Sequence, residues 1–169
     1  MTVRALTFKE LMDKVGGSSN LEKWEPPRIV VVFDPGETVG WAVFDGCSLL
    51  KAGQEAADAK GRLRFVRYLI ESWNPKAVVA EDYIVYAHKA LSHSWSPLDT
   101  AKLVGAIEMA CVIHDVPLYL QTASTGKAFC TDAKLRNWGM YQPGKVHATD
   151  AVRHGAHFLL FHHRNSKGE

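Results

Sequence analysis

The first half of the chain contains three consecutive segments with the apolar pattern of β-strands. Arg28–Phe33 is a run rich in β-branched residues, which is typical of a central strand buried on both faces. The turn-forming residues Asp34-Pro35-Gly36 end this run, and Val39–Asp45 predicts a second strand. The Asp-Gly pair that follows accommodates the positive φ angles of a tight turn. We therefore predict a hairpin whose third strand spans Ser48–Gln54.

Helical and strand patterns alternate along the rest of the chain. Ala57–Trp73 carries apolar residues at spacings of three and four, which predicts an amphipathic helix. Lys76–Ala80 predicts a buried strand, and Leu98–His114 predicts a helix with apolar residues on more than one face. The remaining predicted elements are the strand Val116–Gln121, the short helix Thr131–Trp138 and the closing helix Val146–His163. The core order is βββαβαβα, an α/β fold with a mixed five-stranded sheet flanked by helices.

Residues 1–27 are predicted to be an appendage outside this α/β domain. Thr7 and Glu10 have the spacing of a capping box, in which the hydroxyl and the carboxylate accept from each other's free backbone N–H groups. A short helix up to Val15 should follow, and a stretch of glycine, serine and asparagine ends it. We expect the domain itself to span residues 28–163, followed by a polar tail at residues 164–169.

Composition and charge narrow the class of protein. Of the 169 residues, 47% are hydrophobic and 22% are charged, so one compact domain with a normal core is expected. The net charge is only +2 with neutral histidines, whereas nucleic-acid-binding domains often have a pI above about 9. A DNA-binding surface must therefore come from local clusters of basic residues. No segment has the roughly 20 apolar residues of a membrane span, so we expect a cytoplasmic protein without a membrane partner.

Three acidic residues stand where predicted elements begin or end. Asp34 ends the first strand and Glu81 ends the fourth, which is where ligands gather in α/β sheets. Asp150 lies in the first turns of the closing helix, on the same face as His147 three residues earlier. Oxygen and imidazole ligands gathered in this way suit Mg²⁺ or Mn²⁺. Taken singly, Asp34 is also compatible with a turn, Glu81 with a satisfied strand-end charge and His147 with a packed or capping role.

The order and spacing of these residues resemble those of the RuvC-type Holliday junction resolvases. Val31–Ala42 is similar to the first motif of that family, a hydrophobic strand followed by Asp-Pro-Gly and a glycine that enters the second strand. Val78–Glu81 resembles the second acidic motif, and His147–His154 resembles the closing helix. The stretch from Gln121 to His147 is particularly similar to the compact phage-encoded members. The resemblance runs from Arg28 to Phe161 and implies a ribonuclease H-like fold.

The resemblance also implies an enzyme, a crossover junction endodeoxyribonuclease that hydrolyses phosphodiester bonds with two divalent ions, Mg²⁺ or Mn²⁺. In such sites one ion activates the attacking water and the other stabilises the leaving oxygen. Asp34 is the candidate ligand that bridges the two ions. The implied metal ligands are Asp34, Glu81, His147 and Asp150, and Lys127 completes the catalytic set by supporting the phosphate.

Several residues are candidates for contact with DNA. Lys127, Lys134 and Arg153 are candidate phosphate contacts, which position DNA without reading its sequence. For Lys134, an ordinary surface role is an equally good interpretation. Tyr83 and Tyr86 follow the second acidic motif, where an aromatic residue can stack on the bases of an opened junction. Stacking of this kind contributes about 1–3 kcal/mol per base.

A homodimer is expected, because a resolvase has to cut two opposed strands and a C2 dimer supplies two matched sites. The wide apolar coverage of helix 98–114 makes it the predicted dimer contact, although a helix sandwiched in the core would show the same pattern. The predicted partner is branched DNA, above all four-way junctions, with flaps and forks as further substrates. A phage-encoded member would act in the host cytoplasm.

Other functions stay open at this point. A ribonuclease H acting on RNA–DNA hybrids would share the fold and the ligands, yet would act as a monomer. A non-catalytic branched-DNA-binding protein would have no need of all four ligand-type residues. An actin-type ATPase shares the Asp-x-Gly-x-Thr pattern but needs two lobes, which 169 residues cannot supply. A zinc site in the C-terminal histidines is disfavoured, because only His154 shares the face of His147 and Asp150.

Overall fold

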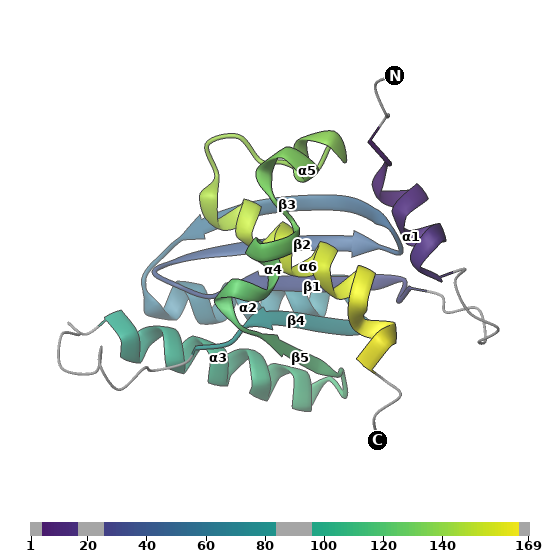
Figure 1. Cartoon of the computed structure of the whole chain (residues 1–169). Coiled ribbons are helices and arrows are strands. Elements are labelled where there is room, and N and C mark those ends of the chain that lie inside the picture. Colours follow the sequence, from purple (N-terminus) through teal and green to yellow (C-terminus); the bar gives the residue numbers. More distant parts are fainter. Residues whose placement is uncertain (1–4, 17–25, 84–95, 166–169) are drawn as a thin grey trace.

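A five-stranded sheet forms the centre of the molecule. The computed structural model describes residues 5–16, 26–83 and 96–165. The strands are β1 (Ile29–Asp34), β2 (Thr38–Asp45), β3 (Ser48–Ala56), β4 (Ala77–Glu81) and β5 (Leu118–Gln121), in the spatial order β3-β2-β1-β4-β5 (Figure 1). β1 is antiparallel to β2 and parallel to β4, and β5 is parallel to β4. The predicted mixed five-stranded sheet is confirmed.

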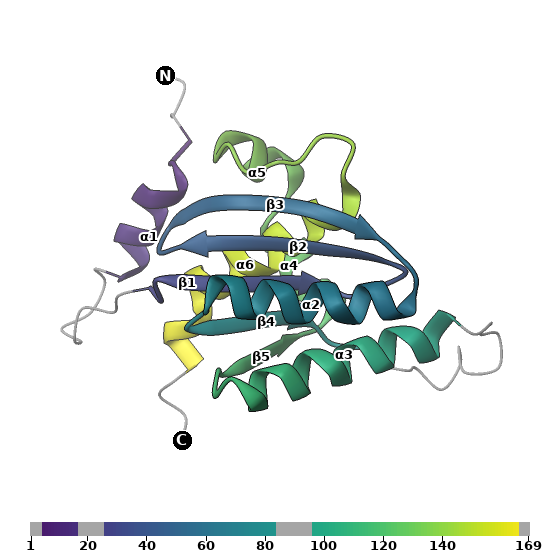
Figure 2. The ribbon, with the colours of Figure 1, turned by 180° about the vertical axis from the view of Figure 1, so that it is seen from behind.

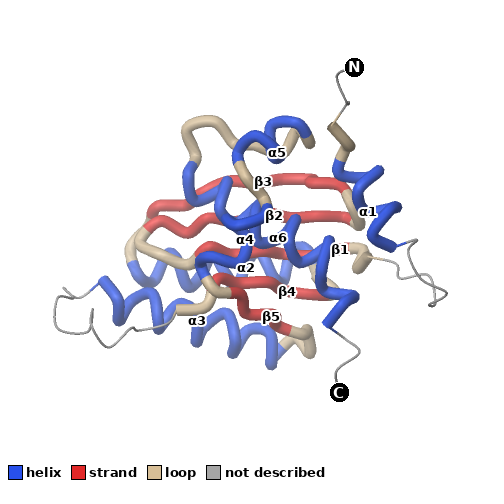
Figure 3. The backbone as a smooth tube through the Cα atoms, viewed as in Figure 1, coloured by secondary structure: helices blue, strands red, loops and turns tan. Residues whose placement is uncertain are grey.

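Helices cover both faces of this sheet. Helices α2 (Ala59–Trp73) and α3 (Ser96–Ile113) lie side by side on one face, which is turned to the viewer in Figure 2. The other face carries α6 (Val146–Asn165), together with α1 (Phe8–Gly16), α4 (Ala123–Phe129) and α5 (Asp132–Asn137) (Figure 3). None of the helices within these described ranges is long and apolar enough to cross a membrane.

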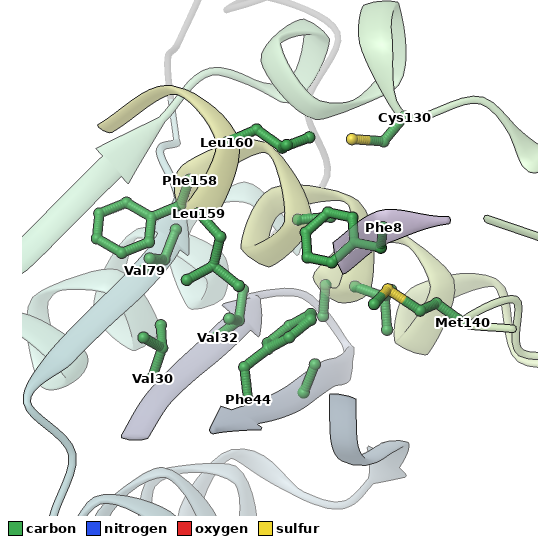
Figure 4. Packing of buried hydrophobic residues seen from close by; sticks show 14 of the residues in the cluster. Phe8, Val30, Val32, Phe44, Val79, Cys130, Met140, Phe158, Leu159 and Leu160 are labelled. Carbon is green, nitrogen blue, oxygen red and sulfur yellow. The ribbon is translucent and has the colours of Figure 1, made fainter. Parts of the chain in front are cut away.

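The side chains of β1 alternate between two core layers. Val30 and Val32 pack on the α6 side, whereas Val31 and Phe33 pack on the side of α2 and α3, and all four are fully buried. Figure 4 shows the layer on the α6 side. Successive strand residues point to opposite faces, so Asp34 at the end of the strand continues on the side of Val32. The continuous apolar run therefore marks a strand buried on both faces, as the sequence predicts.

Two local features predicted from the sequence are confirmed. Asp45 pairs with Ser48 across a two-residue turn, in which Gly46 has a φ of +55°. At the start of α1, the backbone N–H of Thr7 donates to the Glu10 carboxylate (2.8 Å). The backbone N–H of Glu10 in turn donates to the Thr7 hydroxyl (3.3 Å). Both features arise from residues within a few positions of one another, which is why the sequence alone reveals them.

Helix α1 packs against the core of the α/β domain. Phe8 and Met12 are buried in the same hydrophobic cluster as the apolar face of α6. The ring of Phe8 lies 5.1 Å from that of Trp138, centroid to centroid. The side-chain amide of Asn137 donates to the carbonyl of Leu6 (2.9 Å). The division between residues 1–27 and 28–163 stays a prediction, but the helical part of the first segment lies on the domain.

Helix α4 was not predicted from the sequence. Its residues Ser124, Thr125 and Gly126 are weaker helix formers than alanine or leucine, so local propensity does not favour a helix there. The helix lies against α6, and a Cβ built on Gly126 would come 3.1 Å from the Cβ of Arg153. Packing against α6 therefore stabilises a helix that the local sequence does not indicate.

Gly155 provides a test of how closely α6 packs on the sheet. A Cβ at this position would lie 2.3 Å from Cε2 of Phe44 and 2.9 Å from Cγ2 of Val32. Gly155→Ala should lower the Tm, because overpacking costs about 1–3 kcal/mol and outweighs the gain in helix propensity of about 1 kcal/mol. The matched control is Gly105→Ala in α3, where the added Cβ meets no atom within 4 Å and the Tm should stay or rise. Thermal unfolding followed by circular dichroism compares them, and an undiminished Tm for Gly155→Ala would contradict the close packing.

Candidate active site

The two strand-end carboxylates lie on the face of the sheet that α6 covers. β1 and β4 are parallel neighbours, so Asp34 and Glu81 end adjacent strands at the same edge. Asp34 is two residues beyond Val32 and Glu81 is two residues beyond Val79, so each carboxylate lies on the same face of its strand as that valine. Both valines pack on the α6 side. The pleat of the strands therefore directs both carboxylates toward the helix.

The first turns of α6 lie against β2, next to Asp34. Gly40 pairs with Asp34 across the sheet, and a Cβ on Gly40 would come 2.0 Å from the backbone oxygen of His147. Any larger residue at Gly40 would push the helix away from the sheet. His147 and Asp150 are three residues apart and project from one face of the helix. The structure thus brings an imidazole and a third carboxylate to the edge that holds Asp34 and Glu81.

Asp34 is buried and contacts His147. The residue is 8% exposed, and its Oδ2 lies 2.9 Å from Nδ1 of His147. Burial raises the pKa of the Asp34 carboxyl above its ordinary value, the hydrogen bond from His147 opposes the rise, and the charges of Glu81 and Asp150 add to it. Three carboxylates therefore act on one another in a poorly solvated place. Such an arrangement favours a bound cation.

Lys127 reaches this cluster from α4. Its Nζ lies 3.1 Å from Oδ2 of Asp150, and about half of its side chain (51%) is exposed. Burial by itself would lower the pKa of the Lys127 ammonium. The hydrogen bond to Asp150 and the charges of Asp150, Glu81 and Asp34 outweigh burial, so the pKa is raised. Lys127 is thus within electrostatic reach of all three carboxylates, although the helix that carries it was not predicted.

Two other candidate DNA contacts are engaged within the protein. The Arg153 guanidinium pairs with Asp150 and Asp132, and its Nε donates to the carbonyl of Cys130 (3.0 Å). Only 14% of the Arg153 side chain is exposed. The Lys134 ammonium donates to a backbone carbonyl of α4 (2.9 Å) and lies over an aromatic ring of that helix. Contact of either side chain with DNA stays a prediction, and it would require these internal contacts to be exchanged.

The two candidate tyrosines lie in and next to the segment that follows β4. Tyr83 is two residues beyond the end of β4 and is partly buried. Tyr86 lies outside the described residues. Contacts between these rings and the bases of a junction stay predictions.

His154 contacts Glu81 directly, and Gln121 contacts His154. Sequence reasoning missed this role for both residues. His154 is fully buried, with Nε2 3.1 Å from Oε2 of Glu81 and Nδ1 2.9 Å from Oε1 of Gln121. The signal for His154 was its spacing, because it follows Asp150 by four residues and His147 by seven on one helix face. Gln121 had no comparable signal, since its closeness to Glu81 depends on the pairing of β4 with β5.

The donor atoms gathered here suit a hard divalent cation. Carboxylate oxygens are the ligands that Mg²⁺ prefers, and Mn²⁺ also accepts imidazole. Each of the three carboxylates contacts a nitrogen-bearing side chain, Lys127 for Asp150, His147 for Asp34 and His154 for Glu81. Among the described residues, no three His, Cys, Asp or Glu side chains are grouped closely enough to hold a metal ion. Metal binding would therefore require side chains to exchange partners, and the half-exposed Lys127 has room to turn away from Asp150.

Comparison with known proteins identifies the fold. No protein-family model matches the chain, and no curated protein sequence matches it. The structure is similar to T. thermophilus RuvC in complex with a Holliday junction substrate, with a TM-score of 0.66 and 16% identity over 82% of this chain and 96% of that chain. A second Thermus thermophilus RuvC structure gives a TM-score of 0.62 and 16% identity over 80% and 96%. The yeast mitochondrial Holliday junction resolvase gives a TM-score of 0.56 and 12% identity, over 94% of this chain and 89% of that chain. The predicted ribonuclease H-like fold is confirmed, and at these identities the likeness establishes the fold alone.

The charge of Asp34 should destabilise the metal-free protein at neutral pH. Its pKa is raised above the ordinary value of 3.8, so the folded state holds the proton more tightly than the unfolded state. The free energy of unfolding therefore falls as pH rises through the pKa of folded Asp34. Asp34→Asn removes this charge, so in EDTA at pH 7 it should raise the Tm, and each 1 kcal/mol corresponds to roughly 2–4 °C in a chain of this size.

Thermal unfolding of both proteins over a range of pH measures this effect. The advantage of Asp34→Asn should shrink as the pH is lowered toward 3.8, because wild-type Asp34 is then protonated as well. Asp45→Asn makes the same substitution at a partly exposed position at the end of β2 and serves as the control. A Tm for Asp34→Asn below that of the wild type at pH 7 would contradict the prediction.

Proposed function

We propose that this protein is a metal-dependent endonuclease that resolves four-way DNA junctions and cuts other branched DNA by phosphodiester hydrolysis. The observation that carries the proposal is the gathering of three carboxylates and His147 at one edge of a ribonuclease H-like sheet. Two structural neighbours support the substrate class. T. thermophilus RuvC is described in complex with a Holliday junction substrate, and the yeast mitochondrial protein is a Holliday junction resolvase.

Asp34, Glu81, His147 and Asp150 would hold two divalent ions, Mg²⁺ or Mn²⁺. The chemistry that such bound ions supply is Lewis-acid activation of the scissile phosphate and of the attacking water, with stabilisation of the leaving oxygen. Asp34 would be central to this ligand set, because it is buried and the charges of both Glu81 and Asp150 act on it. A divalent charge beside Asp34 would also remove the cost of ionising a buried carboxyl.

Lys127 would support the phosphate. Its ammonium lies 3.1 Å from Asp150, and the surrounding carboxylates raise its pKa, so it carries its charge at neutral pH. Once Asp150 serves as a metal ligand, this ammonium would be available to a non-bridging oxygen of the scissile phosphate. There it would stabilise the negative charge that develops during hydrolysis.

A homodimer is proposed because an enzyme that resolves a junction cuts two opposed strands. On α3, Leu103 and Ile107 are buried against the sheet. Met109, Val112 and Ile113 on the same helix are 60%, 73% and 70% exposed. The apolar residues of this helix thus form two groups, a buried face against the sheet and an exposed patch near the C-terminal end. We propose this patch, made of Met109, Val112 and Ile113, as the dimer contact.

Cleavage of defined DNA substrates tests the proposed function. Labelled four-way junction, flap, linear duplex and RNA–DNA hybrid are incubated with the protein in Mg²⁺, Mn²⁺ or EDTA. We expect paired, metal-dependent nicks in the junction. Asp34→Asn should slow cleavage by at least about 100-fold, because loss of a metal ligand removes several kcal/mol of transition-state stabilisation and each 1.36 kcal/mol is about tenfold in rate.

Asp45→Asn is the control for this experiment. It makes the same substitution at the last residue of β2, which pairs with Ile29 at the other end of β1 from Asp34, so it should cut like the wild type. Cutting of the RNA–DNA hybrid alone would instead assign a ribonuclease H. Tight junction binding without cutting under any divalent ion would leave a non-catalytic binding protein. Either of these outcomes overturns the proposal.

The dimer contact is tested separately with Val112→Lys. An unpaired lysine in an apolar contact costs several kcal/mol, so dimerisation should weaken by at least about 100-fold, since 1.4 kcal/mol is about tenfold. Analytical ultracentrifugation over a range of concentrations measures the change. Leu50→Lys on the edge strand β3, where the side chain is 48% exposed, should leave the dimer intact. A wild type that sediments as a monomer at the concentrations where it cuts junctions would rule out the homodimer.

A further inference from the structure

Three side chains, one of which is a candidate metal ligand, form a chain of hydrogen bonds at the edge of the candidate site. His154 stands in α6 between Glu81 at the end of β4 and Gln121 at the end of β5. Its Nε2 lies 3.1 Å from Oε2 of Glu81, and its Nδ1 lies 2.9 Å from Oε1 of Gln121. The side-chain amide of Gln121 also donates to the backbone carbonyl of His154 (3.3 Å). The ring is therefore held at both nitrogens.

The sheet and the helix together create this chain. Glu81 is paired with Gln121 in the parallel register of β4 and β5, so the two side chains lie next to each other on one face. His154 is one helical turn beyond Asp150, and its side chain is completely buried. A buried imidazole costs free energy unless its nitrogens are hydrogen-bonded, so these partners are what make histidine tolerable here.

The donors and acceptors determine how the ring is oriented. Because the amide nitrogen of Gln121 is used by a backbone carbonyl, its Oε1 faces the ring, and Nδ1 of His154 donates to it. Nε2 then faces Oε2 of Glu81 on the opposite side of the ring. Rotating the ring by half a turn would place carbon atoms against both partners and leave two buried groups unsatisfied. The orientation of His154 is therefore set, and with it the position of one oxygen of Glu81.

We infer that His154 and Gln121 are positioning residues, which hold Glu81 in the orientation needed to bind a divalent ion. This inference rests on the proposed function. Among the described residues, Oε1 of Glu81 forms no hydrogen bond or ion pair, so fixing Oε2 leaves the other oxygen to serve as a ligand. Partners of this kind orient metal ligands in proteins, and their loss typically weakens metal binding by roughly 10–100-fold.

Packing alone would not require this arrangement. An apolar side chain would fill the same buried space without two hydrogen bonds to satisfy. If His154 served only to pack, a phenylalanine of similar shape would leave the properties of Glu81 unchanged. Positioning and packing therefore predict different results for metal binding.

The test measures Mn²⁺ binding to the full chain without DNA, by the electron paramagnetic resonance signal of free Mn²⁺. His154→Phe keeps the ring and removes both nitrogens, and it should weaken Mn²⁺ binding by about 10–100-fold. His154→Gln can still donate to Glu81 through its amide and should recover much of the loss. Four-way junction binding in EDTA should stay within about twofold of the wild type for both variants, because His154 is fully buried and so is not placed on the DNA surface.

His157→Phe is the matched control, since His157 lies on the same helix, packs against Phe161 with its ring tilted and makes none of the contacts to Glu81. It should bind Mn²⁺ like the wild type. Should His154→Phe fail to fold, as judged by thermal unfolding, Gln121→Met decides the question. That variant removes the partner of Nδ1 at the partly exposed end of β5 and should also weaken Mn²⁺ binding.

The outcomes separate this inference from the proposed function. If the wild type binds Mn²⁺ and cuts junctions while folded His154→Phe or Gln121→Met binds Mn²⁺ equally well, positioning is overturned and the nuclease proposal stands. A loss in His154→Phe that His154→Gln does not restore in any part would also count against positioning. If the wild type binds no Mn²⁺, the inference and the metal-dependent function fail together.

Discussion

The close approach of α6 to the sheet is the constraint on which the candidate site depends. Gly40 lets the backbone of His147 come against β2, and Gly155 lets the middle of the helix lie on Phe44 and Val32. Because the helix is this near, its first turns share one small volume with the ends of β1, β4 and β5. Side chains from four elements far apart in the sequence, and Lys127 from α4, can therefore interact directly.

That closeness concentrates negative charge where water is scarce. The pKa of the Asp34 carboxyl is raised by burial and further by the charges of Glu81 and Asp150, while the same carboxylates raise the pKa of Lys127. The excess of negative charge at this edge of the sheet thus contributes to the raised pKa of Asp34 and to that of Lys127. In the proposed enzyme, basic side chains and divalent ions would compete for these carboxylates. Metal binding would then also offset the repulsion between these carboxylates and the cost of ionising buried Asp34, which links stability to function.

Features with local causes were predictable from the sequence. The β-branched run before Asp34, the tight turn at Gly46 after β2 and the capping box of Thr7 and Glu10 each depend on residues within one element or one turn. The edge of the sheet that holds the four ligand-type residues followed from strand ends and helix spacing, which local periodicity also determines. Helix α4 did not follow, because weak helix formers are held there by contact with α6.

By itself, the sequence determined the strands and the long helices of the core, their order, and which carboxylates stand at strand ends, because alternation and helical periodicity act between near neighbours. Only the tertiary structure decided the partners of those carboxylates. The pairing of Asp34 with His147, of Asp150 with Lys127 and of Glu81 with His154 spans elements that the chain order does not place together. These contacts depend on sheet register and on the distance between helix and sheet, and that distance is set by packing across the whole core.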